Sequence, residues 1–160
     1  MAEQTIFKRL KQDHDMHREM LTRMTVAQDA DDRKALFENF KVEVKAHAAA
    51  EEETLYSTML ADPELRHDGQ HSVAEHKELD DLIMKMDELD PSSREWTEKL
   101  KKLSHDYLHH IEEEEKDMFP AAAEELTKKE EVALKDKFEE RKPEEYQRAL
   151  AGADEGDDRE

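Results

Sequence analysis

Two stretches of the chain, His47-Ala48-Ala49-Ala50-Glu51-Glu52 and His110-Ile111-Glu112-Glu113-Glu114-Glu115, share the pattern of a histidine followed four residues later by a glutamate. Upstream of them lie two acid-histidine pairs, Asp13-His14 and Glu75-His76, whose histidines precede those of the motifs by 33 and 34 residues. The order His, His-x-x-x-Glu therefore occurs twice. Four imidazoles and two carboxylates in this order predict a ligand set for a pair of transition-metal ions inside a helical bundle.

The spacing of apolar residues predicts long helices on both sides of these motifs. Glycine (3) and proline (4) are scarce, which favours helices over a turn-rich sheet fold. Short connections between long helices are typical of an antiparallel up-down-up-down four-helix bundle, so we expect an all-α fold of this kind. The repeat at 62 to 63 residues predicts two similar halves related by a pseudo-two-fold axis. The expected helices span about 5–28, 33–60, 70–89 and 94–126.

The C-terminal part of the chain predicts one more helix and a tail. Pro120 falls inside the fourth helix and should kink or shorten it. Thr127-Lys128-Lys129-Glu130 has the spacing of a capping box, so a short fifth helix should follow, with Val132, Leu134 and Phe138 available for docking. We expect residues 1–142 to form one domain, and 143–160 to be an acidic, disordered tail.

Composition limits the possible partners. The 160 residues carry a formal net charge of -19, which repels nucleic acid and anionic lipid. The absence of cysteine excludes disulfides, thiolate zinc sites and cysteine-ligated iron–sulfur clusters. No apolar run approaches the length of a membrane span, and the charged N-terminal segment is unlike a signal peptide. We therefore expect no nucleic-acid or membrane partner and a cytoplasmic location.

Helical geometry places each histidine-glutamate pair on one face of its helix. Residues four apart lie one turn apart, so His47 and Glu51 reach the same region, as do His110 and Glu114. Both pairs lie on apolar stripes and should point inward, where a dication offsets the free-energy cost of burying a carboxylate. A single His-x-x-x-Glu is most often an exposed helix pair. Two such pairs at matched positions favour a metal site.

Several histidines offer alternatives to this ligand set. His109 with Glu113 also has the required spacing, but His109 shares a polar stripe with His105, and both are expected to be solvated. His17 lies three residues after His14 and is either an additional ligand, a hydrogen-bonding neighbour of the ligands or a packing residue. His67 and His71 are interpreted as surface residues without a role.

These motifs resemble those of the hemerythrin-like family, or HHE cation-binding domain, over residues 5 to 140. The resemblance implies a four-helix bundle that holds two non-heme iron ions joined by an oxo or hydroxo bridge. Iron is favoured by a histidine-rich ligand set, and manganese and zinc are alternatives. The implied metal ligands are terminal histidines and bridging glutamates: His14, His47, His76 and His110, with Glu51 and Glu114.

Two departures separate the chain from the oxygen-carrying hemerythrins. The residue four positions after His76 is Asp80, where those proteins have a histidine. The acid after His110 is Glu114, four residues on, where they have an aspartate five residues on. Both departures indicate the broader, non-classical HHE branch, in which water, His17 or Asp80 would replace the missing histidine.

The expected function is binding of, or reaction with, a small ligand such as O2, H2O2 or NO, for sensing or detoxification. Peroxide disproportionation of the catalase type is one possible enzymatic activity. A second hypothesis is a non-enzymatic iron-binding, storage or buffering protein, which the acidic surface favours. A third is a metal-free helical interaction protein, whose stability would not respond to chelation.

Overall fold

The computed structural model describes residues 3–152, and every regular element in that range is helical. This confirms the all-α prediction. The second and fourth expected helices are each divided by a π-helical turn, and the expected connection before residue 70 is mostly helical. The elements are α1 (Ile6–Val26), α2 (Ala30–Glu51), η1 (Glu52–Tyr56), α3 (Ser57–Ala61), α4 (Arg66–Asp87), α5 (Arg94–Glu113), η2 (Glu114–Met118), α6 (Phe119–Glu125) and α7 (Lys128–Leu150).

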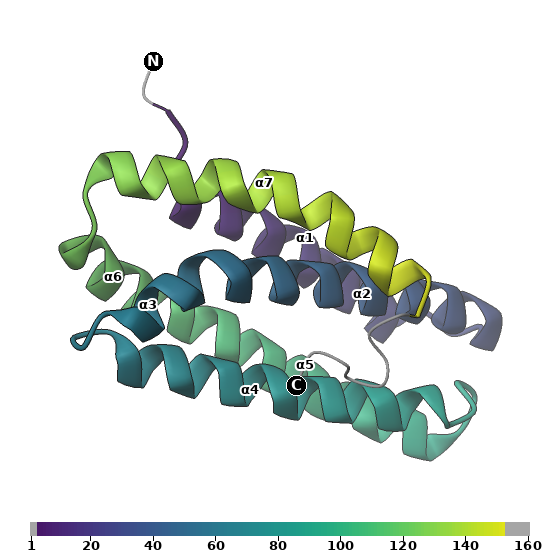
Figure 1. Cartoon of the computed structure of the whole chain (residues 1–160). Coiled ribbons are helices and arrows are strands. Elements are labelled where there is room, and N and C mark those ends of the chain that lie inside the picture. Colours follow the sequence, from purple (N-terminus) through teal and green to yellow (C-terminus); the bar gives the residue numbers. More distant parts are fainter. Residues whose placement is uncertain (1–2, 153–160) are drawn as a thin grey trace.

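Helices α1, α2, α4 and α5 run side by side in alternating directions and form the predicted bundle (Figure 1). Contacts between α1 and α2 hold one half together, and contacts between α4 and α5 hold the other. Contacts of α1 with α5 and of α2 with α4 join the halves. None of the described helices is both long and apolar enough to cross a membrane.

Two π-helical turns, η1 and η2, occur at the same point of each half, next to Glu51 and Glu114. Hydrogen bonds from residue i to i+5 widen the helix there and bring residues five apart towards one face. Pro120 follows η2 within the first turn of α6, where the backbone ladder is already interrupted. The helix thus continues through Pro120, which was expected to kink or shorten the fourth helix, and the interruption of the backbone ladder lies in η2, just before the proline.

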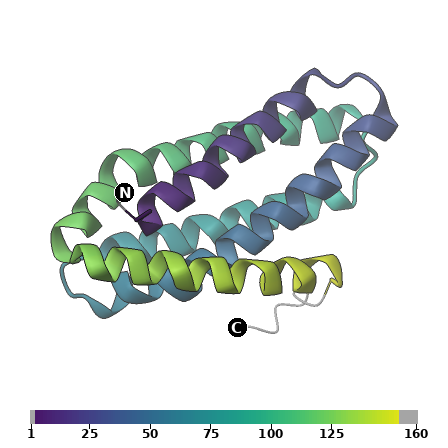
Figure 2. The ribbon, with the colours of Figure 1, turned by 90° about the horizontal axis from the view of Figure 1, so that it is seen from above.

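Helix α7 is longer than the sequence predicted. It spans 23 residues, begins with the predicted capping box at Thr127 and Glu130, and packs along α2 and α1 (Figure 2). Pro143 was expected to begin the disordered tail but lies within α7, where it is exposed. The helix continues because Lys142 and Glu145, on either side of the proline, are buried against the bundle. Of the expected tail, residues 153–160 lie outside the described range.

A polar layer separates two apolar clusters of the core. On α1, Leu10 belongs to one cluster and Leu21 to the other, and the buried Asp13, His14 and His17 lie between them. The helical spacing of the sequence predicts six inward-facing residues on α1, and all six are buried: Ile6, Leu10, His14, His17, Leu21 and Met24. On α4, the same helical spacing predicts that Val73 faces inward, together with Leu79 and Ile83. Val73 is instead 37% exposed, because the buried side of that turn is occupied by Ser72 and Gly69.

Candidate metal centre

The six predicted ligands meet in the polar layer, where helical periodicity turns them towards the bundle axis. Five of them have a relative exposure of at most 2%, and the side chain of His76 has 9%. Nitrogen or carboxylate oxygen atoms of His14, His47 and Glu51 lie within 4.8 Å of one another, as do those of His76, His110 and Glu114. The structure therefore brings together one histidine pair and one glutamate from each half.

Each glutamate also reaches a histidine of the opposite half. Oε1 of Glu51 lies 3.5 Å from Nε2 of His47 and 3.5 Å from Nε2 of His76. Oε1 of Glu114 lies 3.6 Å from Nε2 of His110 and 3.2 Å from Nε2 of His14. Each glutamate thus lies between a histidine of its own half and one of the other half, a position compatible with a carboxylate shared by two ions.

The point where the six side chains converge is called the focus. Several polar atoms at this focus have no hydrogen-bond partner. They are Nε2 of His14, both carboxylate oxygens of Glu51 and Oε1 of Glu114. Nε2 of His76 and Nε2 of His110 face each other at 3.1 Å. Buried polar groups are normally paired, and an unpaired carboxylate is costly. Donor atoms about 2.0–2.2 Å from an ion lie at such separations, so the residues present fit a pair of bound metal ions.

A second carboxylate orients each histidine. The Nδ1 atoms of His14 and His76 donate to Glu115 and Glu52 at 2.7 Å. The Nδ1 atom of His110 donates to Glu75 at 2.7 Å, and that of His47 donates to Asp13 at 2.8 Å. A proton fixed on Nδ1 leaves the lone pair of Nε2 directed at the centre, which is the usual arrangement of metal-binding histidines. Sequence reasoning gave these four acids no role, although each recurs at the same offset in both halves.

Electrostatics at the focus favour a bound cation. Burial, followed by the negative charge of Glu114, raises the pKa of Glu51 well above its usual range. Burial also lowers the pKa of His47 to about 3, which keeps this imidazole neutral and able to coordinate. A cation bound beside these two side chains would take the place of a proton on Glu51 and stabilise it as a carboxylate.

The π-helical turns place two aromatic rings at equivalent positions. Tyr56, five residues after Glu51, packs on His76 with ring centroids 5.1 Å apart. Phe119, five residues after Glu114, stacks on His14 at 6.0 Å. The halves differ here because the Tyr56 hydroxyl donates to Oε2 of Glu114, whereas Phe119 offers no donor to Glu51.

His17 belongs to a hydrogen-bonded chain beside the focus. The Tyr107 hydroxyl donates to Nδ1 of His17 at 2.6 Å, and Nε2 of His17 donates to Glu43 at 2.8 Å. Lys142 then donates to Glu43 at 2.7 Å and to Asp13 at 2.9 Å. Both ring nitrogens of His17 are therefore engaged in hydrogen bonds, and His17 also forms a group with Asp13 and His47 that could hold an ion.

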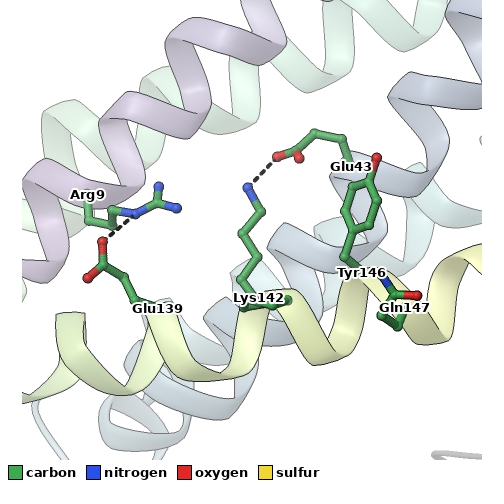
Figure 3. A pocket seen from close by; sticks show the side chains of 7 residues that line it. Arg9, Glu43, Glu139, Lys142, Tyr146 and Gln147 are labelled. Atoms are coloured by element: carbon green, nitrogen blue, oxygen red, sulfur yellow. Dashed lines mark hydrogen bonds and ion pairs between the residues drawn. The ribbon is translucent and has the colours of Figure 1, made fainter.

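An open pocket of about 460 Å³ lies next to these hydrogen-bonded residues, between α7 and the α1–α2 pair. Figure 3 shows Lys142 extending from α7 to Glu43, and Arg9 paired with Glu139 at 3.2 Å. Sequence reasoning missed Glu43 and Lys142, because Lys142 was expected to end a domain rather than to reach the interior. The lining residues are Arg9, Glu43, Glu139, Lys142, Pro143, Tyr146 and Gln147.

The other candidates lie away from the focus. Asp80 lies 3.6 Å from Lys45 with its side chain 46% exposed, and it belongs to none of the metal-binding groups of the described residues. The side chains of His105 and His109 are 82% and 60% exposed, which confirms that they are solvated. His71 is half exposed as expected, but it lies 3.2 Å from both Glu75 and Glu113.

Comparisons with known proteins agree with this geometry. The family model of the hemerythrin HHE cation binding domain matches residues 5–122. The fold is similar to that of a hemerythrin HHE cation binding domain-containing protein from Mycobacterium kansasii, with a TM-score of 0.81, 23% identity and coverage of 93% of this chain and 91% of that one. No curated protein sequence matches the chain. Because the family model covers most of the chain, this protein belongs to the hemerythrin HHE cation-binding domain family.

Proposed function

We propose that this protein is a non-heme di-iron protein that binds or reacts with O2, H2O2 or NO, for sensing or detoxification. The supporting observation is the set of unpartnered atoms at the focus, above all the two oxygens of the fully buried Glu51. A bare carboxylate in a protein interior costs several kcal/mol. A helical bundle retains such a group when a cation supplies the missing partner.

In this proposal His14 and His47 hold one ion, and His76 and His110 hold the other. Glu51 and Glu114 would be shared by the two ions, which their distances to histidines of both halves support. Nitrogen and oxygen donors without sulfur favour iron or manganese. When bound, a pair of ferrous ions would supply the electrons for reaction with a small ligand.

The chain's own residues orient the donors and hold protons at defined atoms. The acids on Nδ1 fix the tautomer of each histidine. The Tyr56 hydroxyl donates a hydrogen bond to Glu114 at the centre. Burial raises the pKa of this phenol well above its usual value of 10, so the phenol oxygen keeps its proton at neutral pH. Two apolar clusters enclose the polar layer along the bundle axis and exclude bulk water from it.

Anaerobic loading with ferrous ions tests the proposal. We expect two iron ions per chain, and a new visible absorption when O2, H2O2 or NO is added. The Glu51→Ala/Glu114→Ala variant should bind two iron ions fewer per chain than the wild type, whereas Glu112→Ala/Glu140→Ala, which removes two exposed carboxylates, should bind as the wild type does. Equal iron content in both variants would contradict the proposal.

The acidic surface supports a second candidate function, iron storage or buffering. A formal net charge of -19 attracts cations from solution irrespective of the buried centre. This function predicts an iron-loaded protein whose absorption does not change with any of the three ligands. The same loading experiment therefore distinguishes the two candidates.

A further inference from the structure

The two halves of the bundle differ in the exposure of the acids that accept hydrogen bonds from His47 and His110. Asp13 and Glu75 are equivalent in the repeat, and each accepts a hydrogen bond from Nδ1 of its histidine. Asp13 is 2% exposed, but the side chain of Glu75 is 21% exposed. One acid is enclosed by the protein, and the other reaches the surface.

Fixed cations neutralise Asp13. Arg9, one helical turn before it, lies 2.6 Å away, and Lys142 of α7 lies 2.9 Å away. The neighbouring face of α2 carries Ala46 and Ala50, both fully buried. Ala50 belongs to the same apolar cluster as Phe138 of α7. In the first half, small residues on α2 allow α7 to pack closely, and two basic side chains pair with Asp13, which is therefore buried.

The second half has a different set of residues at each of these positions. The offset of 62 to 63 residues places His71 where the first half has Arg9, and His109 and Glu113 where it has Ala46 and Ala50. His71 and Glu75 lie one turn apart on α4, and His109 and Glu113 lie one turn apart on α5. Two histidine-glutamate pairs therefore face each other across adjacent helices, in place of an arginine and two alanines.

We propose that His71, Glu75 and Glu113, with His109 beside them, form an outer divalent-cation site on the α4–α5 face, separate from the buried centre. Nε2 of His71 lies 3.2 Å from Oε2 of Glu75 and 3.2 Å from Oε1 of Glu113. The donor atoms of these three residues all lie within 4.8 Å of one another. Nε2 of His109 lies 3.7 Å from Oε2 of Glu113.

The two separations of 3.2 Å around His71 are close to those of tetrahedral coordination. Donors about 2.0–2.2 Å from a zinc ion lie about 3.4 Å from one another at the corners of a tetrahedron. Two neutral imidazoles and two carboxylates also balance the charge of a dication. The second half has no counterpart of the cations Arg9 and Lys142, which neutralise Asp13 in the first half. Glu75 uses Oε1 for His110 and Oε2 for this site, so one carboxylate separates the outer ion from a residue of the buried centre.

Zinc titration of the full-length protein tests the outer site. The measurement is made at mildly alkaline pH, where protons compete least for His71. We expect the His71→Ala/His109→Ala variant to bind one zinc ion fewer per chain than the wild type. The matched control is His105→Ala, which removes an exposed histidine of α5 that pairs with Asp106, and it should bind the wild-type number.

Imidazole NMR signals locate the ion independently of the count. In Glu51→Ala/Glu114→Ala, which disables the buried centre, zinc should still shift the signals of His71 and His109 and leave that of His105 in place. The proposal is overturned if these two signals do not move, or if His71→Ala/His109→Ala binds as many ions as the wild type. A failure of the buried centre alone would appear as an unchanged count in Glu51→Ala/Glu114→Ala, with the His71 and His109 shifts retained.

Discussion

Glu52 accepts a hydrogen bond of 2.7 Å from Nδ1 of His76, although the two residues belong to different halves of the repeat. Glu115 and His14 form the equivalent bond at the same distance. Each half therefore supplies the carboxylate that orients a histidine of the other half. A change at one of these acids should affect the ion on the opposite side without unfolding its own helix.

We predict that Glu52→Gln weakens metal binding by about 10- to 100-fold, because the neutral amide holds the His76 ring and its tautomer less firmly. The effect should fall mainly on the ion next to His76 and His110. Competition with a chelator of known affinity measures it, and circular dichroism checks that the helices persist. The exposed Glu112→Gln serves as the control, and an equal affinity in both variants would refute the orienting role.

Lys142 should contribute strongly to stability because it joins α7 to two buried acids. Lys142→Met leaves Asp13 and Glu43 without this partner, and removing one member of a buried ion pair costs on the order of 3 to 5 kcal/mol. Urea unfolding measures the loss of free energy of unfolding. Lys137→Met, at an exposed position of the same helix, should change it by less than about 0.5 kcal/mol. Similar values for the two variants would mean that α7 docks without these ion pairs.

Metal removal should reverse the order of stability between the wild type and Glu51→Gln. Without metal, the variant should be more stable by about 1 to 2 kcal/mol, because it removes an ionisable group from a site with no partner for it. With metal at 100 times its dissociation constant, the wild type should gain about 2.7 kcal/mol, and the variant much less. Thermal unfolding with and without a chelator tests both statements, and a variant that is less stable in both conditions would contradict them.

Acid should weaken the metal-free protein through Glu115. Burial raises the pKa of this carboxyl, but hydrogen bonds from His14 and Arg18 outweigh burial and bring the pKa to about 2, below its usual 4.5. The unfolded chain therefore binds a proton more readily, so the stabilisation is complete above pH 4.5 and is lost as pH falls towards 2. The difference in unfolding free energy between the wild type and Glu115→Gln should shrink across this window. A difference that does not change with pH would exclude this contribution.

The periodicity of the sequence was enough to predict the bundle and the convergence of six side chains. His14, His47 and His110 occupy apolar stripes with a period of 3.6, so their inward direction follows from the same spacing as that of Leu10 or Leu103. Their role as metal ligands stays a prediction. For Val73 this logic was wrong, because the turn it occupies buries Gly69 and Ser72 instead.

The remaining features depend on contacts between helices, which spacing within one helix does not contain. Lys142 appears as an ordinary surface lysine until α7 is placed beside Asp13. His71 and Glu113 are 42 residues apart in the chain, and they form a cluster only because α4 lies next to α5. The length of α7 was underestimated because a proline usually ends a helix, whereas contacts of the buried Lys142 and Glu145 with the bundle hold this helix together on both sides of Pro143.

The turns η1 and η2 limit the changes of chain length that evolution can make near the centre. Because each turn already accommodates one extra residue, a further residue inserted into Glu52–Tyr56 would rotate everything beyond it by about 100° relative to Glu51. Tyr56 would then leave its place over His76, and the apolar stripe of α3 would turn towards solvent. Connecting segments such as 88–93 can gain or lose residues without this penalty, so we expect length variation among relatives to accumulate there and to spare both π-helical turns.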